Sequence, residues 1–368
     1  MLEAYSRKRK NAIRSAAESL DTPLDVALGA VCQTLPPAVL SGGGQAKLLL
    51  NLQHLPAFAL ETAFGFESRL SDARPACDFF LMAMPGTRFG RYLVEHGAID
   101  NATPAEAALG WFLTEVGRSG SFLSRWFSNA ILEYDVMDAQ VQRPVPMGVF
   151  LEAHSRDRDA HPLVHGTRRR EKLGNPGVMT AAMSSAVGRE ESPPERMAVE
   201  ALFAALPEGA GCSHVGAFPM REPRVLRVVF SMAMRQSARF LDRVGWRGDL
   251  DSVARLSDDL DPLLPRIGLA CDLNESGLRP KVGFELYRGL GWAETPTNSW
   301  HVLLDYLGER DLAIPEKARA IRLWRNREML FDERGTMALV SGVNHFKLIL
   351  DGTALQAKAY IGARLVAA

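Results

Sequence analysis

The fold is constrained most by a recurring pattern of paired strands, each with one polar and one apolar face. The pattern is clearest in residues 344–365, where charged or polar side chains alternate with apolar ones on both arms. Because the side chains of a strand point alternately to opposite faces, each arm gains a polar and an apolar face. Asp351-Gly352-Thr353 between the arms is typical of a tight turn, so the segment predicts a β-hairpin. Its polar face carries His345, Lys347, Ile349, Asp351, Lys358, Tyr360, Gly362 and Arg364.

Four similar strand pairs lie upstream of this hairpin. Their predicted strands span residues 65–70, 76–83, 129–136, 145–153, 212–219, 224–232, 265–274 and 281–287. Helical sequence separates each pair from the next, so we expect an α+β protein with ten antiparallel strands. The polar faces of the upstream strands include Glu67, Arg69, Asp78, Glu133, Asp135, Arg227, Asp272, Lys281, Glu285 and Tyr287.

Two arrangements of these strands are compatible with the pattern. If helices surround the sheet, the apolar faces point at the helices and the polar faces point inward, which requires a barrel with a polar lumen. An open antiparallel sheet, with helices on one face and solvent on the other, would also satisfy the alternation. We expect the barrel, and ten strands enclose a lumen wide enough to hold a ligand.

The composition indicates a cytoplasmic protein without a nucleic-acid or membrane partner. Lys plus Arg and Asp plus Glu each number 43, so no net charge attracts nucleic acid or an anionic membrane. The basic N-terminus has no apolar signal segment, and no stretch approaches 18 consecutive apolar residues. The four cysteines are scattered without a CxxC pair, which argues against a zinc ribbon and a disulfide framework.

We expect a single domain over residues 1–368, with a charged loop or lid insertion at 154–194. This segment is rich in histidine and arginine and includes Arg168-Arg169-Arg170. A solvated loop is favoured over a phosphate-binding or nucleic-acid-binding role. Its three histidines lack carboxylate or cysteine partners at metal-ligand spacing, so no metal site is predicted.

The succession of strand pairs and several short motifs resemble the ABBA, or PT-barrel, fold of aromatic prenyltransferases. The motifs are Lys358-Ala359-Tyr360, Lys281 with Tyr287, Arg69 beside Glu67, and Arg227. The resemblance implies a ten-stranded antiparallel barrel surrounded by helices. It also implies a transferase of natural product biosynthesis, which moves a prenyl group from an allylic diphosphate to an aromatic or peptide acceptor inside the lumen.

The resemblance further implies roles for the lumen side chains. Lysine and arginine would bind the diphosphate, where negative charge grows as it leaves, and the rings of Tyr360 and Tyr287 would shield the allyl cation. The expected catalytic acids are Glu67, Glu133 and Asp135. No DDxxD motif is present, so no cofactor is required and Mg²⁺ is only optional. The expected substrate-binding set is Arg69, Arg227, Asp272, Lys281, Glu285, Tyr287, His345, Lys347, Lys358, Tyr360 and Arg364.

The balance of charge on the polar faces supports an alternative interpretation. Six acids there face six bases, whereas a diphosphate site should be net positive. Balanced charges fit a lumen filled by salt bridges, or a peptide or amino-acid-like ligand bound without diphosphate by an enzyme or a binding protein. For Glu133 and Asp135, structural ion pairing is the favoured interpretation, ahead of acceptor binding, acid–base chemistry or a metal site.

Overall fold

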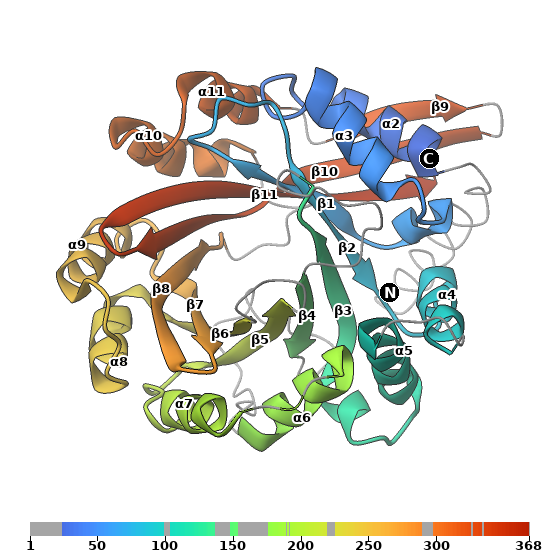
Figure 1. Ribbon diagram of the computed structural model, residues 1–368. Helices are drawn as coiled ribbons and strands as arrows, with labels where there is room; N and C mark the ends of the chain where they lie inside the picture. The colour runs from blue at the N-terminus through green and yellow to red at the C-terminus, as the bar shows by residue number, and fades with distance from the viewer. Residues whose placement is uncertain are drawn as a thin grey trace, which may run out of the picture.

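The strands of the protein form a closed antiparallel barrel, which Figure 1 shows end-on. The computed structural model describes residues 24–98, 104–136, 148–153, 176–188, 190, 192–218, 225–288, 297–324, 327–332 and 335–367. Ten strands follow one another around the barrel in chain order. They are β1 Phe64–Arg69, β2 Asp78–Ala83, β3 Phe127–Tyr134, β4 Gly148–Ala153, β5 Gly211–Phe218, β6 Val225–Ala233, β7 Arg266–Asn274, β8 Gly277–Leu286, β10 Gly335–Asp351 and β11 Ala354–Ala367.

The last strand, β11, closes the barrel. Ala359 of β11 lies opposite Ser68 of β1 on one side and opposite Phe346 of β10 on the other. All ten ladders around the ring are antiparallel. The predicted ten-stranded barrel is therefore confirmed, because an open sheet would leave two of these strands unpaired along one edge.

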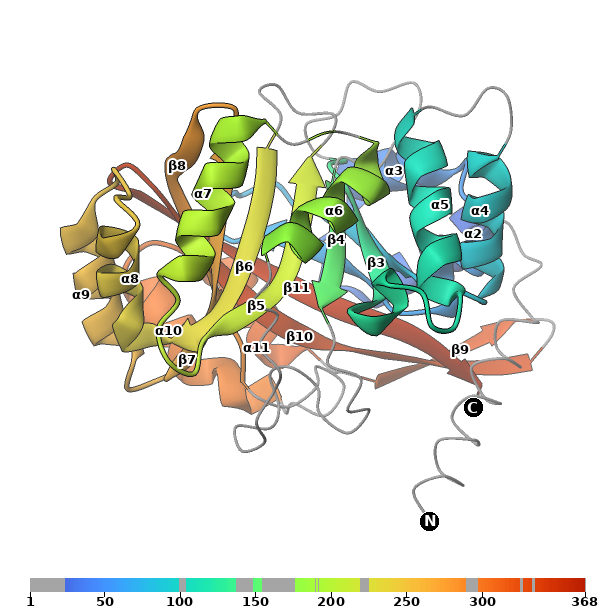
Figure 2. The same cartoon turned by 90° about the horizontal axis from the view of Figure 1, so that it is seen from below.

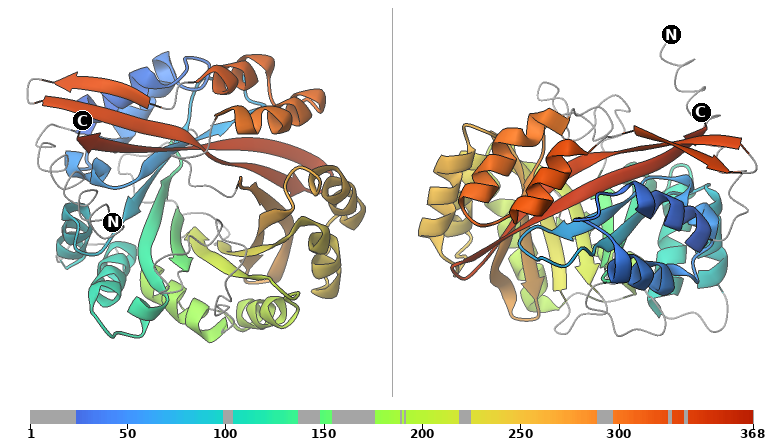
Figure 3. Two further views of the ribbon diagram at one scale, coloured as in Figure 1. Left: turned by 180° about the vertical axis from the view of Figure 1, so that it is seen from behind. Right: turned by 90° about the horizontal axis from the view of Figure 1, so that it is seen from above.

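One further strand, β9 (Arg327–Asp332), lies outside the ring and is not predicted from the sequence. It pairs only with residues Gly335 to Val340 of β10, which run past the barrel as a projecting arm (Figure 3). The predicted hairpin begins at residue 344, whereas β10 begins at Gly335. Residues 335–343 contain no charged side chain, so no polar alternation marks this part of the strand.

Helices cover the outside of the barrel between successive strand pairs (Figures 1 and 2). The α-helices are α2 Leu24–Thr34, α3 Gly42–Leu52, α4 Arg88–Gly97, α5 Pro104–Gly117, α6 Pro176–Val187, α7 Pro193–Ala204, α8 Ser237–Arg243, α9 Leu250–Leu260, α10 His301–Glu309 and α11 Pro315–Leu323. Short 3₁₀ turns are η1 Ala57–Glu61, η2 Leu123–Arg125, η3 Met234–Gln236 and η4 Thr297–Trp300. Local sequence explains several starts: Ser192 and Glu195 form a capping box at α7, and Pro315 occupies the first turn of α11.

Helix α6 corrects part of the prediction for residues 154–194. This helix occupies 176–187 and buries six side chains, including Met179 and Met183, so that stretch is not a loop. Alanine and methionine form helices readily, and the apolar side chains of α6 pack into the main core. The more highly charged residues 154–175 lie outside the described residues.

The apolar strand faces point outward and pack against the helices. Phe230 of β6 contacts Phe203 of α7 with ring centroids 5.4 Å apart, and Phe346 of β10 contacts Trp300 of η4 at 5.2 Å. These strand and helix residues belong to one large buried cluster. Burying this apolar surface is the main driving force that holds the helices on the barrel. The polar strand faces are consequently left to line the lumen.

Candidate functional site

Charged side chains from strands that are not neighbours interact electrostatically across the lumen. Glu133 of β3 raises the pKa of Arg227 on β6, and His214 of β5 contributes to the lowered pKa of Glu285 on β8. Such effects need proximity, and these strands are not neighbours in the sheet. The alternation in the sequence therefore correctly identified the inward face of the strands.

Two lysine–glutamate pairs lie beside the closure of the barrel. Lys358 of β11 binds Glu67 of β1, and Lys347 of β10 binds Glu285 of β8 with 2.9 Å between Nζ and Oε1. Burial alone would raise the pKa of Glu67, but Lys358 and the Tyr360 hydroxyl outweigh it and lower the pKa to about 2. Burial also opposes ionisation of Glu285, yet its cationic neighbours hold its pKa well below the usual range. Both carboxylates are therefore ionised at neutral pH.

A third buried pair joins β6 to β7. Arg227 binds Asp272 through two hydrogen bonds of 2.6 and 2.9 Å, the bidentate geometry that suits a guanidinium and a carboxylate. The Arg227 guanidinium also lies over the Phe218 ring, 4.7 Å from its centroid. Burial would lower the pKa of Arg227, but Asp272 more than compensates and raises it. Asp272 and the Phe218 ring thus both hold the Arg227 guanidinium in place.

Four aromatic rings form a row along the lumen wall beside the two lysine–glutamate pairs. The His345 ring lies 4.6 Å from that of Tyr287 and 4.3 Å from that of Tyr360, and Tyr360 contacts Phe80 at 6.0 Å. Each tyrosine hydroxyl donates a hydrogen bond to a glutamate: Tyr287 to Glu285 at 2.8 Å, and Tyr360 to Glu67. Burial lowers the pKa of His345 to about 4, so the central ring is neutral near pH 7. Glu285 and Glu67 thus hold in place the two tyrosine rings on either side of His345.

Glu133 differs from the other lumen carboxylates. It is partly exposed, and within the described part of the chain its carboxylate makes no hydrogen bond and no ion pair. Burial and the negative charge of Glu67 raise its pKa from 4.5 to about 7, although Lys347 and Arg227 act in the opposite direction. The ion pair expected at Glu133 is therefore not formed among the described residues. Its neighbours in the two flanking strands, Phe80 and Gly148, offer no cation.

Comparison with known proteins gives a match in structure but none in sequence. No protein-family model matches the chain, and no curated protein matches it either. The crystal structure of AnaPT from Neosartorya fischeri, an aromatic prenyltransferase, is similar with a TM-score of 0.51 and 12% identity. The alignment covers 93% of this chain and 92% of that chain. The chain has the PT-barrel fold. At this identity, the similarity extends to the fold alone.

Other predicted site residues lie toward the ends of the PT-barrel strands or just beyond them. Lys281 pairs with Asp351 at 3.5 Å, and both side chains are at least one-third exposed. Arg69, at the end of β1, contacts Asp78 at 3.5 Å. Asp135 directly follows β3. Arg364 is half-buried on the extended part of β11, opposite Val340. Arg69 is also in register with Lys358, so it lies beside the Lys358–Glu67 pair.

Several lumen residues were missed because the sequence search emphasised charge and tyrosine. Phe150, Phe218 and Val225 form a small buried apolar cluster with Ile131, separate from the main core. Asn129 donates a hydrogen bond to Glu152 at 3.0 Å, and neither was predicted to be a site residue. The alternation could have identified some of them: Asn129 and Ile131 lie four and two positions before Glu133, and Val225 lies two positions before Arg227.

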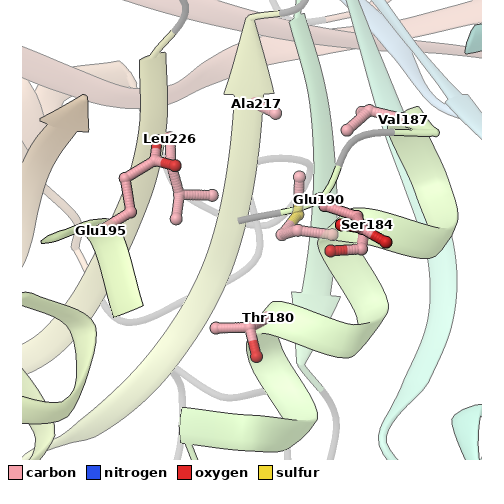
Figure 4. A pocket seen from close by; sticks show the side chains of 8 residues that line it. Thr180, Ser184, Val187, Glu190, Glu195, Ala217 and Leu226 are labelled. Carbon is pink, nitrogen blue, oxygen red and sulfur yellow. The ribbon is translucent and has the colours of Figure 1, made fainter. Parts of the chain in front are cut away.

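Features outside the lumen are weaker candidates. A narrow pocket between α6, α7 and the outer face of β5 and β6 is lined by Thr180, Ser184, Glu195 and Leu226 among others (Figure 4). Glu195 already serves the capping box of α7, which explains a buried carboxylate there without a ligand. Among the described residues, no cluster of His, Cys, Asp and Glu side chains is arranged to hold a metal ion. No described helix is long and apolar enough to cross a membrane.

Proposed function

We propose that this PT-barrel protein is an enzyme that transfers a prenyl group from an allylic diphosphate to an aromatic acceptor in its lumen. The observation that carries the proposal is the row of aromatic rings beside two lysines, one buried and one half-buried, on the inner wall of this fold. A prenyl cation needs electron-rich ring faces, and a departing diphosphate needs cations beside it. Lys347 and Lys358 lie opposite each other on β10 and β11, next to the His345 and Tyr360 rings, and would supply those cations.

The tyrosines would act through position rather than proton transfer. Burial raises the pKa of both Tyr287 and Tyr360 well above the usual value, so their hydroxyls stay protonated and keep donating to the glutamates. This fixes the ring planes before a substrate arrives, and preorganised groups stabilise a transition state without a reorganisation cost. Phe80 extends the same wall toward Glu133, its partner in the neighbouring strand.

The two lysines can bind a diphosphate only if they release Glu285 and Glu67, their present partners. Lys347 and Lys358 would have to turn from Glu285 and Glu67 toward the phosphate oxygens, and a Mg²⁺ ion carried by the diphosphate would reduce the remaining repulsion. A long, flexible lysine side chain permits such a shift more readily than the bidentate Arg227–Asp272 pair does. We therefore expect the two lysines, rather than Arg227, to meet the diphosphate.

The same ion pairs favour a second candidate function. Because Lys347, Lys358 and Arg227 each have an anionic partner, the lumen also suits a peptide or amino-acid-like ligand whose own charges balance. The charged groups of such a ligand would bind the cations and carboxylates of these pairs in place of their present partners, and would add no net charge. An enzyme or a binding protein could use this lumen without any diphosphate.

Calorimetric titration with dimethylallyl, geranyl and farnesyl diphosphates, each with and without Mg²⁺, separates the two candidates. We expect saturable micromolar binding of at least one donor and a prenylated product, seen by mass spectrometry, when indoles or phenols are added. The double variant Lys358→Met/Glu67→Gln removes one pair without leaving an unpaired charge, and should weaken donor binding at least tenfold. Arg322→Ala, which affects only a surface pair on α11, is the matched control.

Absence of donor binding in the wild-type protein, under all of these conditions, would contradict prenyl transfer. The second candidate would then be tested by titrating zwitterionic dipeptides and aromatic amino acids. We would expect their binding to weaken in Lys358→Met/Glu67→Gln and to be unchanged in Arg322→Ala.

A further inference from the structure

Several carboxylates of the described lumen residues have hydrogen-bonding or ion-pairing partners, whereas that of Glu133 has none. Asp78 contacts Arg69, Asp272 binds Arg227, Glu285 binds Lys347, and Glu67 binds both Lys358 and Tyr360. A proton acceptor must have a free lone pair directed at the reacting group. Within the described residues, only Glu133 of these five carboxylates has no partner of this kind.

The surroundings of Glu133 are suited to a flat apolar ring. Phe80 lies opposite it in β2 and Gly148 opposite it in β4. A side chain at position 148 would meet the rings of Phe218 and Phe150 at 2.9 and 3.2 Å, so those rings cover the glycine. The carboxylate therefore stands between aromatic side chains on both flanking sides. It remains partly exposed, so a ligand in the lumen can reach it.

Charged groups face Glu133 from several strands. Arg227 on β6, Lys347 on β10 and Lys358 on β11 favour its ionised form, while Glu67 on β1 disfavours it. The closest carboxylates on its own and flanking strands are Asp135, Asp78 on β2 and Glu152 on β4, each of which has an interaction of its own. Positive and negative groups of the lumen thus act on Glu133 in opposite directions.

We propose that Glu133 is the catalytic base that takes the proton from the acceptor ring, and that Glu67 is a positioning residue for Tyr360. This inference rests on the proposed prenyl transfer. In that step a carbon–carbon bond forms between the allylic carbon and the ring carbon, and the carbon–oxygen bond to diphosphate breaks. Its electron pair leaves with the diphosphate. The ring then loses the proton from its new sp³ carbon to a Glu133 oxygen, and the C–H electron pair restores aromaticity.

The relative basicity of the two glutamates agrees with this assignment. A carboxylate with a pKa of about 2, such as Glu67, is a weak base at neutral pH and holds its lysine and tyrosine instead. A carboxylate with a pKa near 7, such as Glu133, is half ionised there and accepts a proton more strongly. General bases work best when their pKa lies near the operating pH.

The first test is the pH dependence of kcat/KM for prenyl transfer in wild type, Glu133→Gln and Glu67→Gln. We expect the wild-type value to rise with pH through about 7, as Glu133 ionises. Glu133→Gln should lower kcat/KM by roughly 100-fold or more and remove this rise, with donor binding unchanged. Glu133→Asp should restore part of the activity. Glu67→Gln should keep the rise near pH 7, because Glu133 is still present.

The second test does not depend on turnover. Calorimetric binding of indole without donor, in buffers of different ionisation enthalpy, measures the protons moved on binding. We expect proton exchange with the buffer near pH 7 in the wild type and none in Glu133→Gln. An unchanged pH profile in Glu133→Gln, or equal proton exchange in the two proteins, would overturn the assignment. Failure of the proposed function would look different: no diphosphate would bind to the wild type.

Discussion

His345 and Glu133 illustrate how one lumen moves two ionisable groups in opposite directions. Burial disfavours the charged form of each, so it lowers the pKa of the His345 imidazole to about 4 and raises the pKa of the Glu133 carboxyl to about 7. Glu67 escapes this effect because Lys358 and Tyr360 bind it directly. Direct contacts, rather than depth in the barrel, therefore decide which lumen acids stay ionised.

His345 should make the protein sensitive to mild acid. Its folded pKa lies below the ordinary value of 6.5, so its contribution to stability is complete above about pH 6.5 and is lost as the pH falls through about 4. His345→Phe keeps a ring between the tyrosines but cannot be protonated. Between pH 7 and pH 4 we expect the wild type to lose about 2–3 kcal/mol more stability than this variant. Urea unfolding at both pH values measures the difference, and parallel losses in the two proteins would contradict it.

Neighbouring strands fit together through small residues opposite large ones. Gly65 of β1 leaves room for the Phe80 ring of β2, and Gly216 of β5 leaves room for the Phe150 ring of β4. In the same way, Gly283 of β8 leaves room for the side chain of Lys347 on β10. The glycines on the inward face thus determine which large side chains can line the lumen.

Gly65→Ala should be strongly destabilising. A Cβ there would lie 2.2 Å from the carbonyl oxygen of Ile361 and 2.4 Å from the Phe80 ring, and the backbone oxygen cannot move aside. We expect a loss of at least about 1–3 kcal/mol in chemical unfolding. Gly211→Ala in β5 is the matched control: nothing lies within 4 Å of its added methyl group, so its effect should stay within about 0.5 kcal/mol. Equal effects at the two positions would show that the packing described here is wrong.

The pair between β6 and β7 should matter far more than a surface pair. Asp272→Ala leaves the Arg227 guanidinium buried without its partner, which costs about 3–5 kcal/mol. Asp305→Ala, which removes the partner of Arg322 on the surface, should cost less than about 1 kcal/mol. Thermal unfolding of both variants measures this difference. The double variant Arg227→Met/Asp272→Leu should recover most of the loss, because it leaves no buried charge behind.

At the scale of the whole molecule, β11 has a position that no other strand shares. It pairs with β1 and β10 and so joins the two ends of the chain's strand order into a ring. β9 has the opposite situation, since it pairs with the projecting part of β10 alone. Cooperative stability should therefore be greatest at the closure and least in the arm.

Hydrogen exchange should separate these two parts of the sheet. Peptides covering residues 357–363 of β11 should exchange only through global unfolding, because both strand edges are paired there. Peptides covering β9, residues 327–332, should exchange at least about 100-fold faster through local opening. Mass spectrometry of exchanged peptides measures both in one experiment. Comparable protection in β9 and β11 would mean that the arm is not a separate, weaker element.

The sequence by itself determined the strand faces and, through them, most of the architecture. Alternation along β7 and β8 placed Asp272 and Glu285 on the lumen side, and Leu269 and Phe284 on the helix side, because the period of a strand is two. It missed β9, whose three charged residues do not alternate with apolar ones, and the first part of β10, which has no charged residue. It also took the helical residues 176–187 for a loop. Where polar and apolar side chains do not alternate, the sequence gives no sign of a two-faced strand.

Only the tertiary structure decided which lumen groups bind one another. Lys358 and Glu67 are 291 positions apart, and their contact exists because β11 returns to β1. The register of β3 with β2 and β4 places Glu133 between Phe80 and Gly148, without a cation in register, although the sequence favoured an ion pair for it. A strand pattern fixes the direction of a side chain, whereas its partner depends on strand order and register, which are properties of the closed barrel.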